Sequence, residues 1–292
     1  MEPLRAIIYG IVQGLTEFLP ISSNAHIRMT PVLFGWTEDV ETFTAFTAVI
    51  QLGTTLAVLI YFAKDLKRVL GGWFASMKKG ADKNTQEAKM GWGVLFGTIP
   101  IIILGLLLKH QIETTFRSLY VIAIALIGMG LVMLYFDRKP GQRGLETVTV
   151  KDGILVGLWQ CLALLPGMSR SGSTISGGQA LGFDRVSAAR FSFLLGIPSI
   201  ALAGFKELWD FRKSIGGELL VPTAIATVVS FVVGYASIAW LMKIVAKRGV
   251  TPFVWYRFAV GALLLVLLGI GKIHPFDGAD PIPEPRLAAP VK

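Results

Sequence analysis

Two charged residues, a glutamate and an arginine, interrupt otherwise apolar sequence. Glu17 lies in GLTEFLP, and Arg170 lies in PGMSRSGSTISGG. A charged side chain is costly within hydrocarbon, so it is expected to face a cavity, a cation or a partner of opposite charge. For Glu17 the alternative is a packing hydrogen bond with Gln13, which lies one helical turn earlier on the same face.

The residues around Arg170 have the composition of a phosphate-binding loop. The neighbours with hydroxyl groups or accessible backbone amides are Ser169, Ser171, Gly172, Ser173 and Thr174. A helix expected to start near Gly172 would direct its positive dipole end and free N–H groups at the loop. Because guanidinium geometry matches phosphate oxygens, the segment is predicted to bind phosphate. The alternative, an ion pair of Arg170 with Glu17, would also bring the two segments together.

A hydroxyl and an imidazole follow Pro20 at close spacing. Ser22, Ser23 and His26 could supply a nucleophile and a proton acceptor on a tight turn. Serine is also a common helix cap, so Ser22 or Ser23 could cap the next helix instead, and His26 could lie at the membrane interface. These alternatives stay open at the level of sequence.

Two further polar residues lie in long apolar stretches. Arg257, in TPFVWYRFAVGALL, could contact a phosphate, neutralise Glu17, or extend to an interface. Gln51, in AVIQLGTTLAV, is interpreted mainly as a packing residue.

The composition is that of an integral membrane protein. Of 292 residues, 53% are hydrophobic and 16% charged, whereas about a quarter of the residues of a soluble domain are charged. The net charge is +9, but the basic residues lie between apolar runs. Anionic lipid headgroups are therefore a simpler partner than nucleic acid, and no nucleic acid is expected. The single cysteine excludes a disulfide within the chain.

Six stretches are long enough to cross a bilayer, which takes about 20 residues. They lie near 42–62, 91–109, 118–136, 186–206, 220–242 and 252–271. A single membrane domain is expected over 1–273, followed by a flexible, proline-rich tail over 274–292.

Two more apolar segments, 3–34 and 153–183, are each broken by a Leu-Pro pair followed by hydroxyl residues. Proline stops a helix, and exposed backbone at membrane depth is tolerated only inside protein or beside a water-filled cavity. Both segments are predicted to be re-entrant helical hairpins. The expected fold is all-α: six transmembrane helices plus two re-entrant hairpins.

The two halves, about 1–136 and 153–272, carry a weak repeat. Gly10, Gln13 and Leu15 recur as Gly157, Gln160 and Leu162, and Leu19-Pro20 recurs as Leu165-Pro166. Further matches pair Leu52-Gly53 with Leu195-Gly196 and, loosely, Thr98–Pro100 with Val250–Pro252. Because three spans per half is odd, the second half should insert upside down, as in inverted-repeat transporters. The Lys/Arg bias of the loops predicts both termini on the outer side.

The segments QGLTEFLPISSNAH and PGMSRSGSTISGG closely resemble the two signature regions of the undecaprenyl-pyrophosphate phosphatase family, also called bacitracin-resistance proteins. The resemblance implies hydrolysis of undecaprenyl pyrophosphate to undecaprenyl phosphate, which recycles the lipid carrier for peptidoglycan synthesis. It also implies a divalent cation, Mg²⁺ or Ca²⁺. The protein would lie in the bacterial plasma membrane, with the active site open to its outer, periplasmic face.

Carried over by position, the resemblance assigns roles to the residues of both motifs and of the last span. They are Gln13, Glu17, Ser22, Ser23, His26, Ser169, Arg170, Ser171, Thr174 and Arg257. Many members have glutamate where this chain has Gln13. A metal bound by Glu17 and Gln13 would then need phosphate oxygens or waters to complete its shell.

The mechanistic hypothesis gives the attack on the terminal phosphorus to Ser23, with His26 as proton acceptor. Attack by His26, or by a water that it activates, is the alternative. A different class, an inverted-repeat transporter or flippase for a phosphorylated lipid or anion, would need only the binding groups. The sequence does not determine the oligomeric state, so a homodimer stays open.

Overall fold

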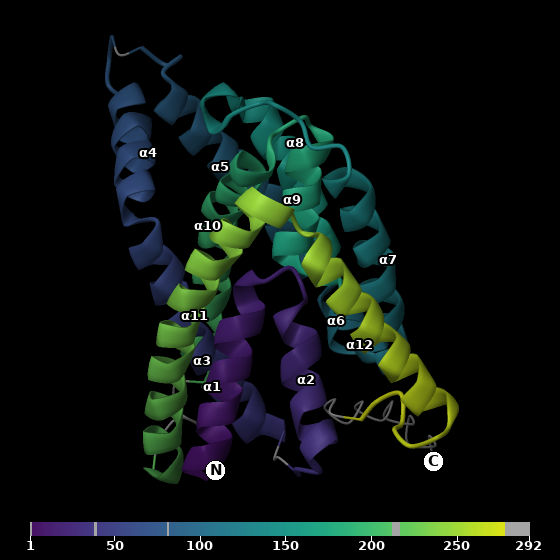
Figure 1. Ribbon diagram of the computed structural model, residues 1–292. Helices are drawn as coiled ribbons and strands as arrows, with labels where there is room; N and C mark the ends of the chain where they lie inside the picture. The colour runs from purple at the N-terminus through teal and green to yellow at the C-terminus, as the bar shows by residue number, and fades with distance from the viewer. Residues whose placement is uncertain (1, 38–39, 81, 212–216, 278–292) are drawn as a thin grey trace, which may run out of the picture.

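The computed structural model describes residues 2–37, 40–80, 82–211 and 217–277, and within these ranges it is helical with no strand (Figure 1). The α-helices are α1 (Pro3–Phe18), α2 (Ser23–Phe34), α3 (Val40–Tyr61), α4 (Ala63–Ser76), α5 (Gln86–Leu107), α6 (Lys109–Glu113), α7 (Leu119–Asp137), α8 (Val150–Gln160), α9 (Arg170–Ala180), α10 (Arg185–Phe211), α11 (Leu220–Arg248) and α12 (Thr251–Gly269). Short 3-10 helices are η1 (Thr115–Arg117), η2 (Leu145–Thr147), η3 (Cys161–Leu164) and η4 (Gly217–Leu219). The predicted all-α class is confirmed.

Six of the described helices are long and apolar enough to cross a membrane. The candidate spans are Thr42–Tyr61, Gln86–Leu107, Leu119–Asp137, Arg185–Lys206, Leu220–Arg248 and Thr251–Gly269. Each overlaps one of the predicted stretches, so these six predictions are confirmed. The protein is a multi-pass membrane protein.

Two short helix pairs, α1–α2 and α8–α9, occupy the middle of the bundle. In Figure 1, α1 and α2 reach the middle from the end that carries the N-terminus, and α8 and α9 reach it from the opposite end. The backbone at both tips is strained. Among the described residues other than glycine, Ser22 (φ 77°) and Ser169 (φ 68°) alone have positive φ, a conformation uncommon outside glycine. Each serine immediately precedes the second helix of its pair.

Close glycine contacts hold the two pairs in place. A Cβ added at Gly10 of α1 would lie 2.7 Å from the carbonyl oxygen of Ala226 in α11. At Gly157 of α8 it would lie 2.1 Å from the carbonyl oxygen of Gly97 in α5. Small residues allow membrane helices to approach this closely. Both pairs are therefore fixed by a long neighbouring helix.

The start of α8 is fixed by a capping box and an ion pair. The Thr149 hydroxyl accepts from the Asp152 amide, and the Asp152 carboxylate accepts from the Thr149 amide. Arg143 donates to both carboxylate oxygens of Asp152, at 3.1 and 2.7 Å. Burial alone would raise the pKa of Asp152, but the hydrogen bonds from Arg143 and Thr149 outweigh it, and the pKa lies below its ordinary value.

Two proline-containing segments differ from the layout that the sequence predicts. The repeat match of Thr98–Pro100 with Val250–Pro252 is wrong, because Pro100 lies inside α5 whereas Pro252 lies in the first turn of α12. In the predicted flexible tail, the Pro275 carbonyl oxygen accepts from the Leu119 amide at 2.7 Å. Residues 278–292 lie outside the described residues.

Candidate functional site

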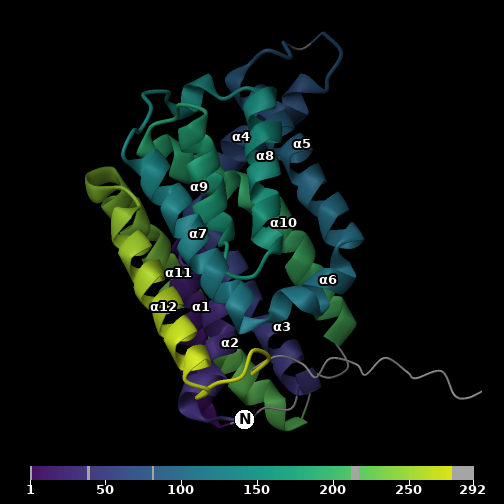
Figure 2. The ribbon, with the colours of Figure 1, turned by 90° about the vertical axis from the view of Figure 1, so that its right-hand side faces the viewer.

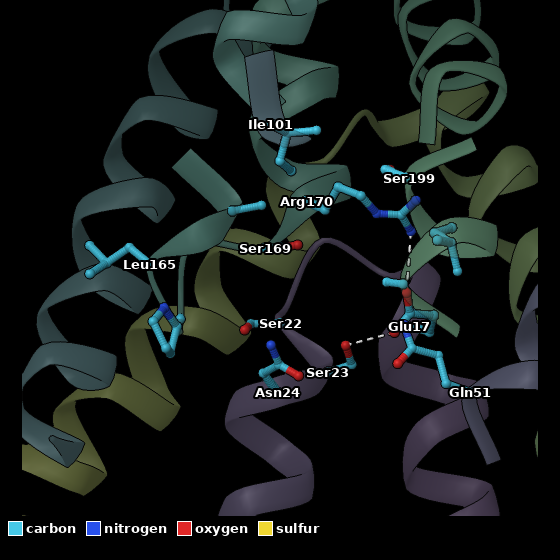
Figure 3. A pocket seen from close by; sticks show the side chains of 15 residues that line it. Glu17, Ser22, Ser23, Asn24, Gln51, Ile101, Leu165, Ser169, Arg170 and Ser199 are labelled. Carbon is cyan, nitrogen blue, oxygen red and sulfur yellow. Dashed lines mark hydrogen bonds and ion pairs between the residues drawn. The ribbon is translucent and has the colours of Figure 1, made fainter. Parts of the chain in front are cut away.

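A cavity of about 220 Å³ lies where the tips of α1–α2 and α8–α9 meet (Figure 3). Its polar side chains come from α1, the start of α2, α3, α9 and α10. They are Glu17, Ser22, Ser23, Asn24, Gln51, Ser169, Arg170 and Ser199. The two interrupted segments of the sequence therefore build one site.

Glu17 connects the two tips. Its Oε1 accepts from Arg170 Nη2 at 3.3 Å, and its Oε2 accepts from Ser23 Oγ at 2.8 Å (Figure 3). Oε2 also accepts from Gln13 Nε2 at 3.1 Å. The side chains of Glu17 and Arg170 are 8% and 14% exposed. The ion pair of Arg170 with Glu17, considered from the sequence as an alternative, is therefore present, and Ser23 joins it through Glu17. The carboxylate is oriented by a cation and hydrogen-bonded to a hydroxyl.

The Arg170 guanidinium lies directly against α10. A Cβ added at Gly196 would lie 2.1 Å from Arg170 Nη1. The absence of a side chain at Gly196 thus gives the guanidinium the space it needs to reach Glu17.

We expect Gly196→Ala to lower the activity of this site by about tenfold or more, because the new methyl group must displace the guanidinium. Gly128→Ala in α7 is the matched control, since nothing lies within 4 Å of a Cβ there. The measurement is the turnover of both variants beside their melting temperatures. Wild-type turnover in Gly196→Ala would show that the position of the guanidinium is not critical.

Most hydroxyls of the predicted phosphate loop do not reach the cavity. Ser171, Ser173 and Thr174 are 2%, 0% and 1% exposed, because α9 runs into the core immediately after Arg170. The Thr174 hydroxyl donates to the Arg170 carbonyl oxygen at 2.8 Å, and the Gly172 amide donates to Ser169 Oγ at 3.2 Å. Of the predicted phosphate-binding side chains, only Ser22, Ser169 and Arg170 line the cavity, and the expectation for the others is corrected.

His26 is engaged away from Ser23. Its Nδ1 lies 2.8 Å from the Ser22 carbonyl oxygen, and its Nε2 lies 2.8 Å from the Tyr256 hydroxyl. A carbonyl oxygen can only accept, so Nδ1 donates, and in the neutral imidazole Nε2 then accepts from Tyr256. Neither ring nitrogen is left for the proton of Ser23, which is hydrogen-bonded to Glu17 instead. The predicted pairing of Ser23 with His26 is therefore not the arrangement found.

Arg257 is also placed differently from the expectation that it binds phosphate. It is fully buried, does not line the cavity, and donates to five backbone carbonyl oxygens. Those acceptors lie in the α1–α2 tip, the α8–α9 tip and α7: Pro20, Gly167, Met168, Ala125 and Leu126. Arg257 cross-links the two tips from behind the cavity.

Sequence reasoning missed part of the site. Gln51, interpreted mainly as a packing residue, lines the cavity, as do Asn24 and Ser199. The Ser199 hydroxyl lies 3.3 Å from the side-chain oxygen of the buried Gln160. For Gln51, a lone amide inside an apolar span was the available signal; Ser199, an ordinary serine within α10, offered none.

The site offers a single carboxylate to a metal ion. Across the described residues, no group of three or more His, Cys, Asp or Glu side chains could hold one. Glu17 lines the cavity, whereas Gln13, the other predicted ligand, does not line it and directs its side-chain nitrogen at Glu17. This site suits a cation bound through one carboxylate together with substrate phosphates and waters, as Mg²⁺ commonly is.

Comparison with known proteins identifies the family. The family model described as bacitracin resistance protein BacA matches residues 6–263. The chain belongs to the BacA family. An undecaprenyl-diphosphatase of Nocardioides sp. is 49% identical over 271 residues, covering 92% of this chain and 98% of the relative. One of Myxococcus xanthus is 48% identical, covering 98% and 95%, and undecaprenyl-diphosphatase 2 of Streptomyces avermitilis is 45% identical, covering 94% and 98%.

The BacA match extends over the tips of both helix pairs and over Arg257. It contains every residue that lines the cavity. The site therefore belongs to the part of the chain that defines the family.

Proposed function

We propose that this BacA protein hydrolyses undecaprenyl diphosphate to undecaprenyl phosphate and phosphate, which recycles the lipid carrier for peptidoglycan synthesis and confers bacitracin resistance. The names of its relatives support the substrate. The observation that carries the chemistry is the 2.8 Å hydrogen bond of Ser23 to Glu17, in the same cavity as Arg170. A nucleophile, a proton acceptor and a phosphate-binding cation are then adjacent.

In the proposed reaction the terminal phosphate replaces Glu17 as the partner of Arg170. This exchange frees the carboxylate to accept a proton. Ser23 Oγ bonds to the terminal phosphorus as the bond from that phosphorus to the bridging oxygen breaks, and Glu17 takes the serine proton. Undecaprenyl phosphate leaves with the bonding electrons. Water then attacks the phosphoserine as the bond from phosphorus to Ser23 Oγ breaks. Glu17 returns its proton to Ser23 Oγ, and both water protons leave with the released phosphate.

A divalent cation, Mg²⁺ or Ca²⁺, is part of the proposal. Glu17 would hold it together with phosphate oxygens and waters, and Gln13 would join it only with its amide turned so that the oxygen faces the ion. When bound, it would neutralise charge on the diphosphate.

The two short helix pairs are re-entrant hairpins of an inverted repeat in this proposal. Support comes from Ser22 and Ser169, which share an unusual backbone conformation and stand at the same separation in sequence as Gln13 and Gln160. The packing of α1 on α11 and of α8 on α5 agrees with it. The loop charges favour a site open to the outer face of the plasma membrane.

Purified protein in detergent micelles is expected to release phosphate from undecaprenyl diphosphate. No membrane separates two compartments in micelles, so a transporter would release none. Rapid quenching with substrate labelled at the terminal phosphate should leave label on the peptide that contains Ser23. Label on His26, or turnover with no labelled intermediate under conditions that trap one in a serine phosphatase, would reject the serine route.

A further inference from the structure

One part of the cavity lining is an apolar wall. The wall consists of side chains from α5, from the turn after α8 and from α10: Ile101, Ala163, Leu165, Pro166, Ile200 and Ala203. None of these can bind a phosphate. An apolar wall beside an ionic site suits a substrate that is itself charged at one end and apolar at the other.

One face of α10 changes character along its length. Gly196 contacts the Arg170 guanidinium, Ser199 follows three residues later with a hydroxyl in the cavity, and Ala203 follows four residues after that. Residues at this spacing share a helix face. Within two turns, this face of α10 therefore presents first the contact with the Arg170 guanidinium, then the Ser199 hydroxyl, and last the exposed and apolar Ala203.

The packing of α5 becomes looser along the same direction. At Gly97 an added Cβ would lie 2.3 Å from the Gly153 carbonyl oxygen, so α5 touches α8 there. At Gly105 the nearest atom to an added Cβ is Leu164 Cδ2, at 3.6 Å. Ile101 lies midway between these positions and lines the cavity. At Gly97 the contact between α5 and α8 is thus too close for any side chain. At Gly105 the contact between α5 and η3 is an ordinary van der Waals contact.

The wall itself reaches the outside of the bundle. α5 and α10 lie next to each other in Figure 2, and the wall residue Ala203 of α10 is exposed. Leu162 of η3, which precedes the wall residue Ala163, is 41% exposed. An apolar path thus leads from the ionic site to the outer surface of the bundle, without a charged side chain among the wall residues.

We propose that the isoprenoid chain of the substrate leaves the cavity between α5 and α10, across Ile101, Ala163, Ile200 and Ala203. This inference rests on the proposed function and names the site of the substrate's apolar part. The chain is covalently joined to the diphosphate that Arg170 holds, so it must start in this cavity. The apolar wall keeps the chain in surroundings as apolar as the lipid from which it comes, so no polar group is left unsatisfied against it. Ala163 and Ala203 have small side chains, which leave space for the isoprenoid chain to pass.

The test is Ala203→Trp, assayed with isopentenyl, farnesyl and undecaprenyl diphosphate in detergent. A tryptophan in the path should lower kcat/KM for the farnesyl and undecaprenyl substrates by about tenfold or more, because overpacking must be relieved before a long chain fits. The value for isopentenyl diphosphate, whose chain is too short to pass α10, should stay within about twofold. Leu202→Trp, at the adjacent exposed position of α10, is the matched control and should behave as wild type with all three substrates.

The possible results distinguish a wrong path for the isoprenoid chain from a wrong assignment of the reaction. The path would be overturned if Ala203→Trp hydrolysed undecaprenyl diphosphate at the wild-type rate. It would also be overturned if kcat/KM fell equally for all three substrates. A wild-type protein that releases phosphate from none of them would refute the proposed function itself. If Ala203→Trp does not fold, Ala163→Trp takes its place with the same expectation. A photoreactive group on the first isoprene unit should label peptides of α5 and α10, and labelling confined to other helices would also overturn the path.

Discussion

Replacing Glu17 with glutamine is expected to lower phosphate release by about 10²- to 10⁴-fold, the usual contribution of a general base. Glutamine keeps the size of the side chain and can still accept a hydrogen bond from Ser23. It cannot take the serine proton, and it leaves Arg170 without its anionic partner. The measurement is kcat for phosphate release from undecaprenyl diphosphate in detergent.

Asp65→Asn in α4 is the matched acid-to-amide control for Glu17→Gln. Asp65 is paired with Arg190 at 2.8 Å and does not line the cavity, so its variant should keep kcat within about twofold. Glu17→Asp should recover part of the loss, because the base is retained but displaced. A Glu17→Gln protein that is folded and turns over at the wild-type rate would show that another group deprotonates the nucleophile.

The contact between Glu17 and Arg170 could be predicted, because a charged side chain within apolar sequence is stable in only a few kinds of place. Each lies beside a Leu-Pro break, so each had to be at the tip of an interrupted helix. A buried charge needs a partner, and each of these two residues meets a charge of opposite sign at the other tip. Composition and helix breaking therefore determined this contact without any knowledge of the distances.

The orientation of His26 could not be predicted in the same way. Its position three residues after Ser23 suggested a local pair, but its Nε2 contacts Tyr256, which lies 230 residues away in the sequence. Such a contact depends on how α12 packs beside α2. Likewise, the hydroxyls of α9 appeared equivalent in the sequence, and only the direction of α9 into the core separates Ser169, at the cavity, from Ser173.

The backbone conformation of the two tips could not be predicted from the sequence either. Ser22 and Ser169 adopt positive φ, where glycine or asparagine would be the usual choice. Strain of this kind, of order 1–3 kcal/mol per residue, persists only where the surroundings enforce it. Here both serines line the cavity, and the strained turns direct their side chains into the site.

The enforcing element is Arg257, whose role differs most from the sequence expectation. An arginine in the last span was expected to bind phosphate, neutralise Glu17 or reach an interface. Instead its guanidinium is fully buried and satisfies carbonyl oxygens of Pro20, in one tip, and of Gly167 and Met168, in the other. These carbonyls belong to interrupted helices and have lost their helical partners, which is the deficit that an arginine with five donors can fill.

Arg257→Lys is therefore expected to lower the free energy of unfolding by about 3 kcal/mol or more. Lysine has fewer donors and a shorter reach, and each buried carbonyl left unsatisfied costs about 1–3 kcal/mol. The measurement is denaturant unfolding of the substrate-free protein in detergent. Arg248→Lys, at the exposed C-terminal end of α11, is the control and should change stability by less than about 0.5 kcal/mol. If Arg257 instead bound phosphate, the lysine variant would unfold like wild type and differ only in KM. Activity should fall together with stability, because the same carbonyls position Ser22 and Ser169 on either side of the cavity.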